Sequence, residues 1–340
     1  MVSMKDIASI CGVSVGTVSK ALSNQPGVSE KRCRHIQEVA SRFNYRPNAL
    51  VRGIQSGRTK SVAVGCNAVE DPWASMVLRG CLKALHEVGY EAWLLQWDLG
   101  VHSGEHLLRS MGERRVDGII FFPPASEPSL EYHEELRNFP GPVILLDQRL
   151  NYHGYHFVGT DDRPGMLDAL KHLVDLGHRS IGCIGFPNVT TGKVRLNAFV
   201  DGMSQHGLTV RSEWIGTACD YDEGITAAHQ LLTQPERPTA LLCFSDLVAW
   251  AALNVASELS LSVPGDLSLV GFADLPVAQR LRPRLTTVSQ PNEGLGQRGV
   301  DLLMSCIEDG EDRGLARNPR NILLPTQLVV RESTGPMVLN

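Results

Sequence analysis

The sequence predicts an α/β protein in which a small all-helical unit precedes a larger body built from parallel sheets. Three observations predict this class. Apolar residues in the first 45 positions recur at helical spacing. From residue 60 onward, continuous apolar runs of strand length alternate with amphipathic helical stretches, as in parallel sheets covered on both faces. The 340 residues, 43% of them hydrophobic, are enough for two or three domains with separate cores.

The first 43 residues predict three short helices. The first carries Ile7, Ala8 and Ile10 and stops at Gly12. Ser14 is a good N-cap for the second, because its hydroxyl can accept an unpaired backbone N–H of the next turn. That second helix runs from 15 to 22, and a third begins near Ser29. The third helix places four apolar residues on one stripe: Ile36, Val39, Ala40 and Phe43. Three helices with a tight turn between the first two form a helix-turn-helix unit.

A linker follows the third helix. Pro47 in NYRPN ends that helix, since proline disfavours the helical state at the residue before it. Residues 49–56 are a short helix candidate that contains Gly53, which costs about 1 kcal/mol relative to alanine. One or two isolated turns are unstable in water. We therefore expect this segment to become helical only when a partner holds it.

The body predicts two similar α/β lobes of about 100 residues each. Helical stretches at 74–88, 166–176 and 247–259 alternate with eight apolar runs: SVAVGC, YEAWLLQW, DGIIFF, PVILLD, HFVGTD, SIGCIGF, TALLCF and LSLVGF. Ligands of such folds bind at the carboxyl ends of the strands, and between two lobes those ends border a cleft.

Charge is unevenly distributed between the two parts. The net charge is −5 overall, but residues 1–60 carry +7 and the remaining 280 residues carry −12. We call residues 1–60 the head and the remaining residues the body. A basic head on an acidic body indicates that only the head contacts the phosphates of a nucleic acid. The start of the chain lacks a signal-peptide pattern and no apolar run reaches 18 residues, so we expect a cytoplasmic protein without membrane contact. The eight cysteines form no C-x-x-C pair, which favours reduced thiols over disulfides or zinc.

Three motifs match patterns of enzyme active or cofactor sites, but the residues around each motif do not fit the structure that the pattern requires. Residues 12–16 fit the G-x-S-x-G nucleophile elbow, which needs a strand before the serine, whereas a helix precedes Ser14. Residues 102–106 fit the zinc pattern H-x-x-E-H, but Gly104 and a helix that starts at Glu105 leave His102 outside the helix. Gly182 and Gly185 give only half of a dinucleotide fingerprint. The sequence therefore predicts no catalytic residue, no metal ligand and no cofactor.

The chain resembles the lactose-repressor (LacI/GalR) family over nearly its whole length. The resemblance rests on KDIA, GVS-x-x-TVSKALS, VSE and NYRPN in the head, and in the body on RRVDGIIFFPP, PVILLDQR, VGTDD, HLVDLGHRSIGCIG, VPGDLSLVGFAD and LLPTQLVVREST. It implies a DNA-binding transcriptional regulator, a repressor, with two periplasmic-binding-protein-like lobes. It also implies a helix-turn-helix domain at 1–46, a hinge at 47–59 and an effector-binding and dimerisation domain at 60–340. The N-lobe would span about 60–160 and 291–323, and the C-lobe about 161–290 and 324–340.

The resemblance implies the following DNA contacts. Residues 15–22 would be the recognition helix in the major groove, with Val15, Gly16 and Lys20 at base-reading positions. Gly16 departs from the family because it has no side chain with which to read a base. Ile54 would wedge into the minor groove and kink the duplex; the alternative is a linker residue packed on its own domain. The remaining implied DNA-binding residues, several of them phosphate contacts, are Ser3, Ser14, Thr17, Ser19, Asn24, Ser29, Tyr45, Asn48 and Val51.

The resemblance also implies an effector cleft between the lobes. Its expected lining is Trp73, Asp147, Arg149, Thr191, Arg195, Tyr221, Asp246, Asp274 and Gln290. Asp161 is as compatible with a structural role as with a ligand contact. Many relatives have an aspartate where this chain has Ala273, so a bidentate carboxylate for sugar hydroxyls is missing. The effector class stays open between a sugar, a sugar derivative and a nucleobase-like molecule.

We expect a homodimer on a pseudo-palindromic, double-stranded operator, since one head reads only a half-site. The six residues GPMVLN after Thr334 are too short for a tetramerising helix. Ligand closure of the cleft would change whether both hinge segments can fold on DNA together. The alternatives are a stand-alone solute-binding protein and a hydrolase built on Ser14.

Overall fold

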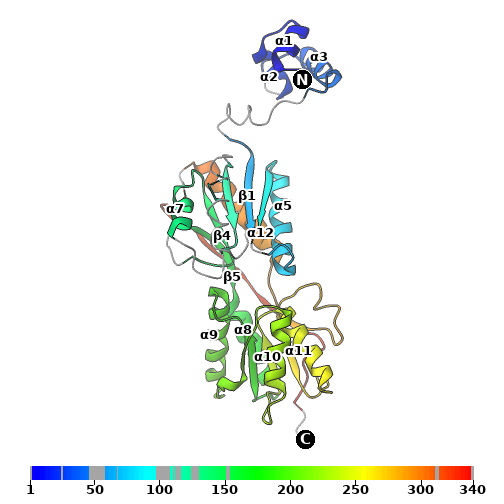
Figure 1. The fold of residues 1–340 in the computed structure, drawn as a ribbon, viewed down its shortest axis with the longest axis vertical. Helices are drawn as coiled ribbons and strands as arrows, with labels where there is room; N and C mark the ends of the chain where they lie inside the picture. Colours follow the sequence, from blue (N-terminus) through cyan, green and yellow to red (C-terminus); the bar gives the residue numbers. More distant parts are fainter. Residues whose placement is uncertain are drawn as a thin grey trace. The chain divides into compact units, whose positions relative to one another are not determined.

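The computed structural model describes residues 2–23, 26–45, 58–66, 68–96, 108–109, 111, 116–123, 130–150, 154–310 and 314–337. The chain separates into two compact units, Met1–Lys60 and Ser61–Asn340, which are described separately below (Figure 1). The segment 102–106, which fits a zinc pattern, lies outside the described residues. None of the described helices is long and apolar enough to cross a membrane.

The first unit consists of three helices around a small core. They are α1 (Met4–Cys11), α2 (Val15–Leu22) and α3 (Glu30–Arg42). Gly12 ends α1 in the left-handed region (φ 63°), as the sequence predicts. The buried core residues come from all three helices: Ile7, Ala8, Val18, Ala21 and Ile36.

Two apolar residues of the first unit, Ile10 and Phe43, do not join this core. Ile10 is 52% exposed and Phe43 is 43% exposed. Ile10 lies one position before the end of α1. Phe43 follows the last residue of α3, where the backbone has left the helix. The expectation that Phe43 belongs to the apolar stripe of the third helix was therefore wrong.

The second unit contains two sheets of six strands each. The first has the order β11-β5-β4-β3-β1-β2 and is parallel throughout. Its strands are β1 (Ser61–Cys66), β2 (Glu91–Gln96), β3 (Gly118–Phe121), β4 (Val143–Leu146), β5 (His156–Asp161) and β11 (Asn321–Pro325). The helices around it are α5 (Pro72–Glu87), α7 (Leu130–Asn138) and α12 (Asn292–Asp309).

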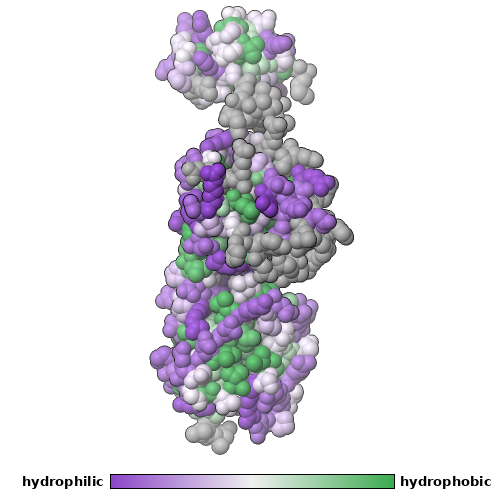
Figure 2. Space-filling model, turned by 90° about the vertical axis from the view of Figure 1, so that its left-hand side faces the viewer, coloured by the Kyte–Doolittle hydropathy of each residue, from purple (hydrophilic) through white to green (hydrophobic). Residues whose placement is uncertain are grey.

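The second sheet has the order β12-β10-β9-β8-β6-β7, with β12 antiparallel to β10. Its strands are β6 (Ile181–Gly185), β7 (Ile215–Thr217), β8 (Ala240–Cys243), β9 (Ser268–Ala273), β10 (Thr286–Ser289) and β12 (Gln327–Val329). The helices around it are α8 (Asp162–Asp175), α9 (Thr190–Gln205), the short η1 (Ser212–Trp214), α10 (Tyr221–Leu232) and α11 (Asp246–Glu258). Figure 2 shows a largely hydrophilic surface with an apolar area on the side that carries α9. Two apolar residues of α9, Val194 and Val200, are exposed.

The chain passes three times between the two lobes that these sheets define. The passages lie between β5 and α8, between β10 and α12, and between β11 and β12. The parallel strands of both sheets therefore end near the same junction, where a ligand site is expected.

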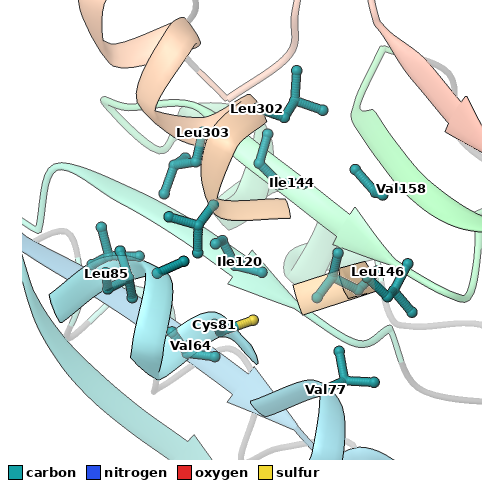
Figure 3. Packing of buried hydrophobic residues seen from close by; sticks show 14 of the residues in the cluster. Val64, Val77, Cys81, Leu85, Ile120, Ile144, Leu146, Val158, Leu302 and Leu303 are labelled. Carbon is teal, nitrogen blue, oxygen red and sulfur yellow. The ribbon is translucent and has the colours of Figure 1, made fainter. Parts of the chain in front are cut away.

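The helices α5 and α12 pack closely against each other on one face of the first sheet. Figure 3 shows their apolar side chains over the strands, with Val77, Cys81 and Leu85 from α5 and Leu302 and Leu303 from α12. The backbones of α5 and α12 are in direct contact at two glycines, Gly80 and Gly296. A Cβ atom at Gly80 would overlap the carbonyl of Glu293, and one at Gly296 would overlap the carbonyl of Val77. Small residues therefore set the distance between these helices.

Candidate functional site

The helix α2 presents an exposed face opposite the residues that it buries. Val18 and Ala21 point into the core, whereas Val15, Gly16 and Lys20 are exposed. Ser14 caps the helix, since its Oγ accepts the backbone N–H of Thr17 at 3.1 Å, and the predicted capping role is confirmed. An eight-residue helix with a cap and an outward basic end can enter a major groove.

The other predicted DNA-binding residues have varied surroundings. Ser3 caps α1 in a capping box with Asp6, and its Oγ donates to the Asp6 carboxylate at 2.7 Å. Ser29 precedes α3 without making a side-chain cap. Tyr45 packs against the small core, and Thr17 and Ser19 are half-buried on α2. Four predicted residues lie outside the described part of the chain: Asn24, Asn48, Val51 and Ile54.

A pocket that is partly open to solvent lies between the two lobes. Five predicted effector residues line it: Trp73, Asp147, Thr191, Arg195 and Gln290. The other lining residues are Asp71, Gln148, Phe186, Cys219, Phe244, Ser245, Leu247, Phe272, Ala273 and Leu275.

Arg195 is the single Lys or Arg among the described lining residues, and it is held by a buried ion pair. Its Nε donates to Asp162 Oδ2 at 2.7 Å, and its Nη1 donates to the carbonyl of Phe244 at 2.6 Å. Only 7% of the Arg195 side chain and 2% of the Asp162 side chain are exposed. The guanidinium also lies 3.8 Å from the centre of the Phe272 ring. Two of its three nitrogens are therefore committed to the protein.

Asp147 faces the pocket in a strained backbone conformation, with a φ of 63°. Its carboxylate accepts from Gln148 Nε2 at 3.0 Å. Burial raises the pKa of Asp147 to about 6; the positive charge of Arg195 opposes this rise, and the negative charges of Asp162 and Asp71 add to it. Asp147 is thus a carboxylate that lacks a full counter-charge.

Gln148 connects the two lobes across the pocket. Its Nε2 donates to Thr191 Oγ1 at 2.7 Å, and its Oε1 accepts the backbone N–H of Thr190 at 3.1 Å. Both groups belong to the first turn of α9, which has no side-chain cap of its own. On the other side, Gln290 donates to Thr160 Oγ1 at 2.7 Å, and Asn292 donates to the carbonyl of Ala273 at 2.9 Å. These bonds hold the lobes together at the rim of the pocket.

Four predicted effector residues do not line the pocket, because each is bonded elsewhere. Arg149 lies over the Phe157 ring and donates to Asn321 Oδ1. Tyr221 accepts from Asn254 and packs against Trp250. Asp274 pairs with Arg331 at 2.6 Å. Asp246 is fully buried beneath the pocket and accepts from Thr287 Oγ1 and from the backbone N–H of Leu275, both at 2.6 Å.

Sequence reasoning missed two thirds of the lining. Most missed residues are apolar. Phe186, Phe244 and Phe272 lie at the ends of β6, β8 and β9, and composition does not distinguish an apolar residue in the sheet core from one that lines a pocket. Gln148 follows Asp147 directly, so its place after a buried strand was the available signal.

Among the described residues, Cys219, Asp220 and Glu223 are close enough to hold a metal ion, and all three are exposed. Their geometry is explained without one. Asp220 caps α10 by accepting the N–H of Glu223, and Glu223 accepts the N–H of Cys219, both at 2.8 Å. The group is a helix cap.

The buried carboxyl of Asp246 makes stability depend on pH. Burial raises its pKa from 3.8 to about 7. Between these values the folded protein holds a proton that the unfolded chain has lost, so this group's contribution to the free energy of unfolding falls as pH rises from about 4 to about 7. The slope is at most about 1.4 kcal/mol per pH unit. Asp246→Asn keeps the shape without the proton, and urea unfolding should show the wild type losing stability relative to it over this range. Parallel pH profiles would contradict the assignment.

Comparison with known proteins bears on both units. Residues 3–48 match the model "Bacterial regulatory proteins, lacI family", and residues 170–334 match "Periplasmic binding protein-like domain". The chain is 30% identical over 335 residues to the HTH-type transcriptional regulator DegA of Bacillus subtilis (strain 168), covering 98% of both chains. The chain belongs to the lacI family of bacterial regulatory proteins. This lacI-family chain is also 31% identical to the HTH-type transcriptional repressor PurR of Glaesserella parasuis serovar 5 (strain SH0165), with 98% of both covered.

Solved structures agree with this membership of the lacI family. A transcriptional regulator CelR–cellobiose complex superimposes with a TM-score of 0.74 at 26% identity, covering 98% of this chain and 100% of the other. The Lac repressor dimer bound to operator and the anti-inducer ONPF superimposes with a TM-score of 0.86 at 23% identity, covering 98% and 99%. The second likeness concerns the fold alone. The lacI family consists of transcriptional regulators, in agreement with the sequence-based expectation.

Proposed function

We propose that this protein is a transcriptional repressor that binds a pseudo-palindromic operator as a homodimer and releases or holds it in response to a small molecule in the inter-lobe pocket. The observation that carries the proposal is the capped helix α2 with Val15, Gly16 and Lys20 exposed, in a chain of the lacI family. A regulator of this kind works in the compartment that holds the DNA, which supports the expected cytoplasmic location.

Exposed apolar side chains support the dimer. Leu82 and Val88 lie on or directly after α5, and Leu94 lies on the edge strand β2; each is more than 40% exposed. An edge strand with apolar side chains is a surface that proteins usually cover. Two copies joined there would each bring one α2, as a two-fold symmetric operator requires.

The pocket supports the effector. It lies between lobes that Gln148, Gln290 and Asn292 connect, so a bound molecule can change the angle between them. The relative named CelR was solved with cellobiose. We propose the same inter-lobe place for this chain's effector.

The test is selection of duplexes from a random library by the full-length protein, followed by sequencing. The proposal predicts an enriched site of two half-sites related by two-fold symmetry. A single unpaired half-site would contradict the dimer, and the absence of any enriched sequence would contradict operator recognition.

Lys20→Ala should weaken binding to the selected duplex by about 1–3 kcal/mol, which is roughly 5- to 150-fold, because a lysine at the end of α2 can bond base edges. Sequence discrimination at one symmetric pair of positions should relax as well. Lys193→Ala on α9 removes the same charge from the body and should leave affinity unchanged. Fluorescence anisotropy measures both variants, and equal affinities would remove Lys20 from the interface.

A further inference from the structure

The charges of the inter-lobe pocket are unbalanced. Asp71 and Asp147 supply two carboxylates to the lining, against the single guanidinium of Arg195. That guanidinium is already neutralised by Asp162 at 2.7 Å. Among the described lining residues, the carboxylates of Asp71 and Asp147 have no cation of their own. The described part of the lining is therefore electronegative.

Arg195 cannot easily turn to a ligand anion. To do so it would leave Asp162, 2% exposed, as a buried charge without its partner. Breaking a buried ion pair in this way costs about 3–5 kcal/mol. An anionic group would also approach Asp147, and two like charges at close range oppose each other most strongly where water is excluded. Burial is the main cause of the raised pKa of Asp147, and repulsion from Asp162 and Asp71 adds to it.

The unpaired polar atoms of the lining define what a ligand has to supply. The indole N–H of Trp73 has no acceptor among the described residues, but it is buried away from solvent and sets no requirement on a ligand in the open pocket. Among the described residues, Gln148 is the donor to the carboxylate of Asp147, so this carboxylate has room for an O–H or N–H donor of a ligand. Ser245 accepts the N–H of Leu247 and keeps its own proton for donation. Phe186 and Leu275 add apolar contact.

We infer that, if the pocket is the effector site proposed above, it selects a neutral or cationic effector that donates an O–H or N–H to Asp147. Molecules with a phosphate or carboxylate group, such as sugar phosphates, sugar acids and nucleotides, are rejected. Uncharged sugars, amino sugars and nucleobases meet these requirements.

The test uses two probes from one bacterial small-molecule extract passed over a strong anion-exchange column. The flow-through holds neutral and cationic compounds, and the salt eluate, after desalting, holds the anionic ones. Each pool is added to the full-length protein, and thermal unfolding of the body is followed. A bound molecule raises the melting temperature by mass action. We expect the flow-through to raise it and the eluate to leave it unchanged.

Two variants connect the shift to the pocket. Asp147→Asn keeps the shape and tolerates the left-handed backbone, but it loses the charge-assisted bond, so the flow-through should shift it much less. Asp168→Asn, an exposed position on α8, makes the same charge change and should respond like the wild type. A shift caused by the eluate, or an equal response of Asp147→Asn, overturns the inference.

No shift with either pool overturns the inference together with effector binding. Operator binding is measured separately by anisotropy, so this result would neither support nor contradict it. A shift with the eluate leaves the proposed effector function in place and removes only the charge selection.

Discussion

Arg195→Ala is expected to lower the free energy of unfolding of the body by about 3–5 kcal/mol, since it leaves Asp162 buried without its counter-charge. The carbonyl of Phe244 would lose its charged donor too. The neighbouring Arg163 provides a matched control, because its ion pair with Asp201 is exposed (44% and 50%) and should contribute only about 0–1 kcal/mol. Urea unfolding of both variants measures the difference.

Similar losses in Arg195→Ala and Arg163→Ala would show that the buried pair is not a structural element. A large loss has a further consequence. Failure of Arg195→Ala to respond to an effector would then follow from a damaged pocket, so it would not identify Arg195 as a ligand contact. Asp147→Asn is the better probe of the site.

Gly296→Ala is expected to destabilise the body by about 1–3 kcal/mol, because the added methyl group enters the contact between α12 and α5. The new Cβ would lie 2.7 Å from the backbone nitrogen of Cys81 and would overlap the carbonyl of Val77, so the helices have to separate. Backbone atoms cannot rotate away as side chains can.

Gly294→Ala is the control in the same helix. Its Cβ would meet only Pro291 at 3.5 Å, an ordinary contact, and alanine favours the helix by up to about 1 kcal/mol. Thermal unfolding should therefore place Gly294→Ala at or above the wild type and Gly296→Ala well below it. Equal melting temperatures of the two variants would contradict the close contact between α5 and α12 at Gly296.

The sequence predicted the elements whose stability is local or strongly apolar. The run HFVGTD coincides with β5, and the helix expected at 247–259 is shifted by one residue from α11. The strands β7, β10, β11 and β12 were missed. β10 reads TTVS and is held by tertiary bonds, since Thr286 receives the backbone N–H of Arg331 at 2.9 Å. The antiparallel β12 also departs from the parallel sheets that were predicted.

The site shows the same division. The resemblance implied the five predicted residues that line the pocket: Trp73, Asp147, Thr191, Arg195 and Gln290. The hydrogen-bond partners of these side chains could not be predicted from the sequence. Asp246 is the first residue of α11, near the pocket. Its carboxylate nevertheless points inward, because it accepts a hydrogen bond from Thr287 Oγ1 there. Such choices depend on neighbours more than 40 residues away.

The most direct measurement is the affinity of the full-length protein for duplex DNA across a salt series. A basic head that grips phosphates releases counterions, so affinity should fall by about 10³-fold or more between about 50 and about 200 mM salt. Lys20→Ala should bind more weakly at every salt concentration, while Lys193→Ala should follow the wild type. Absence of binding at the lowest salt, or an affinity that salt does not change, would contradict DNA recognition by this protein.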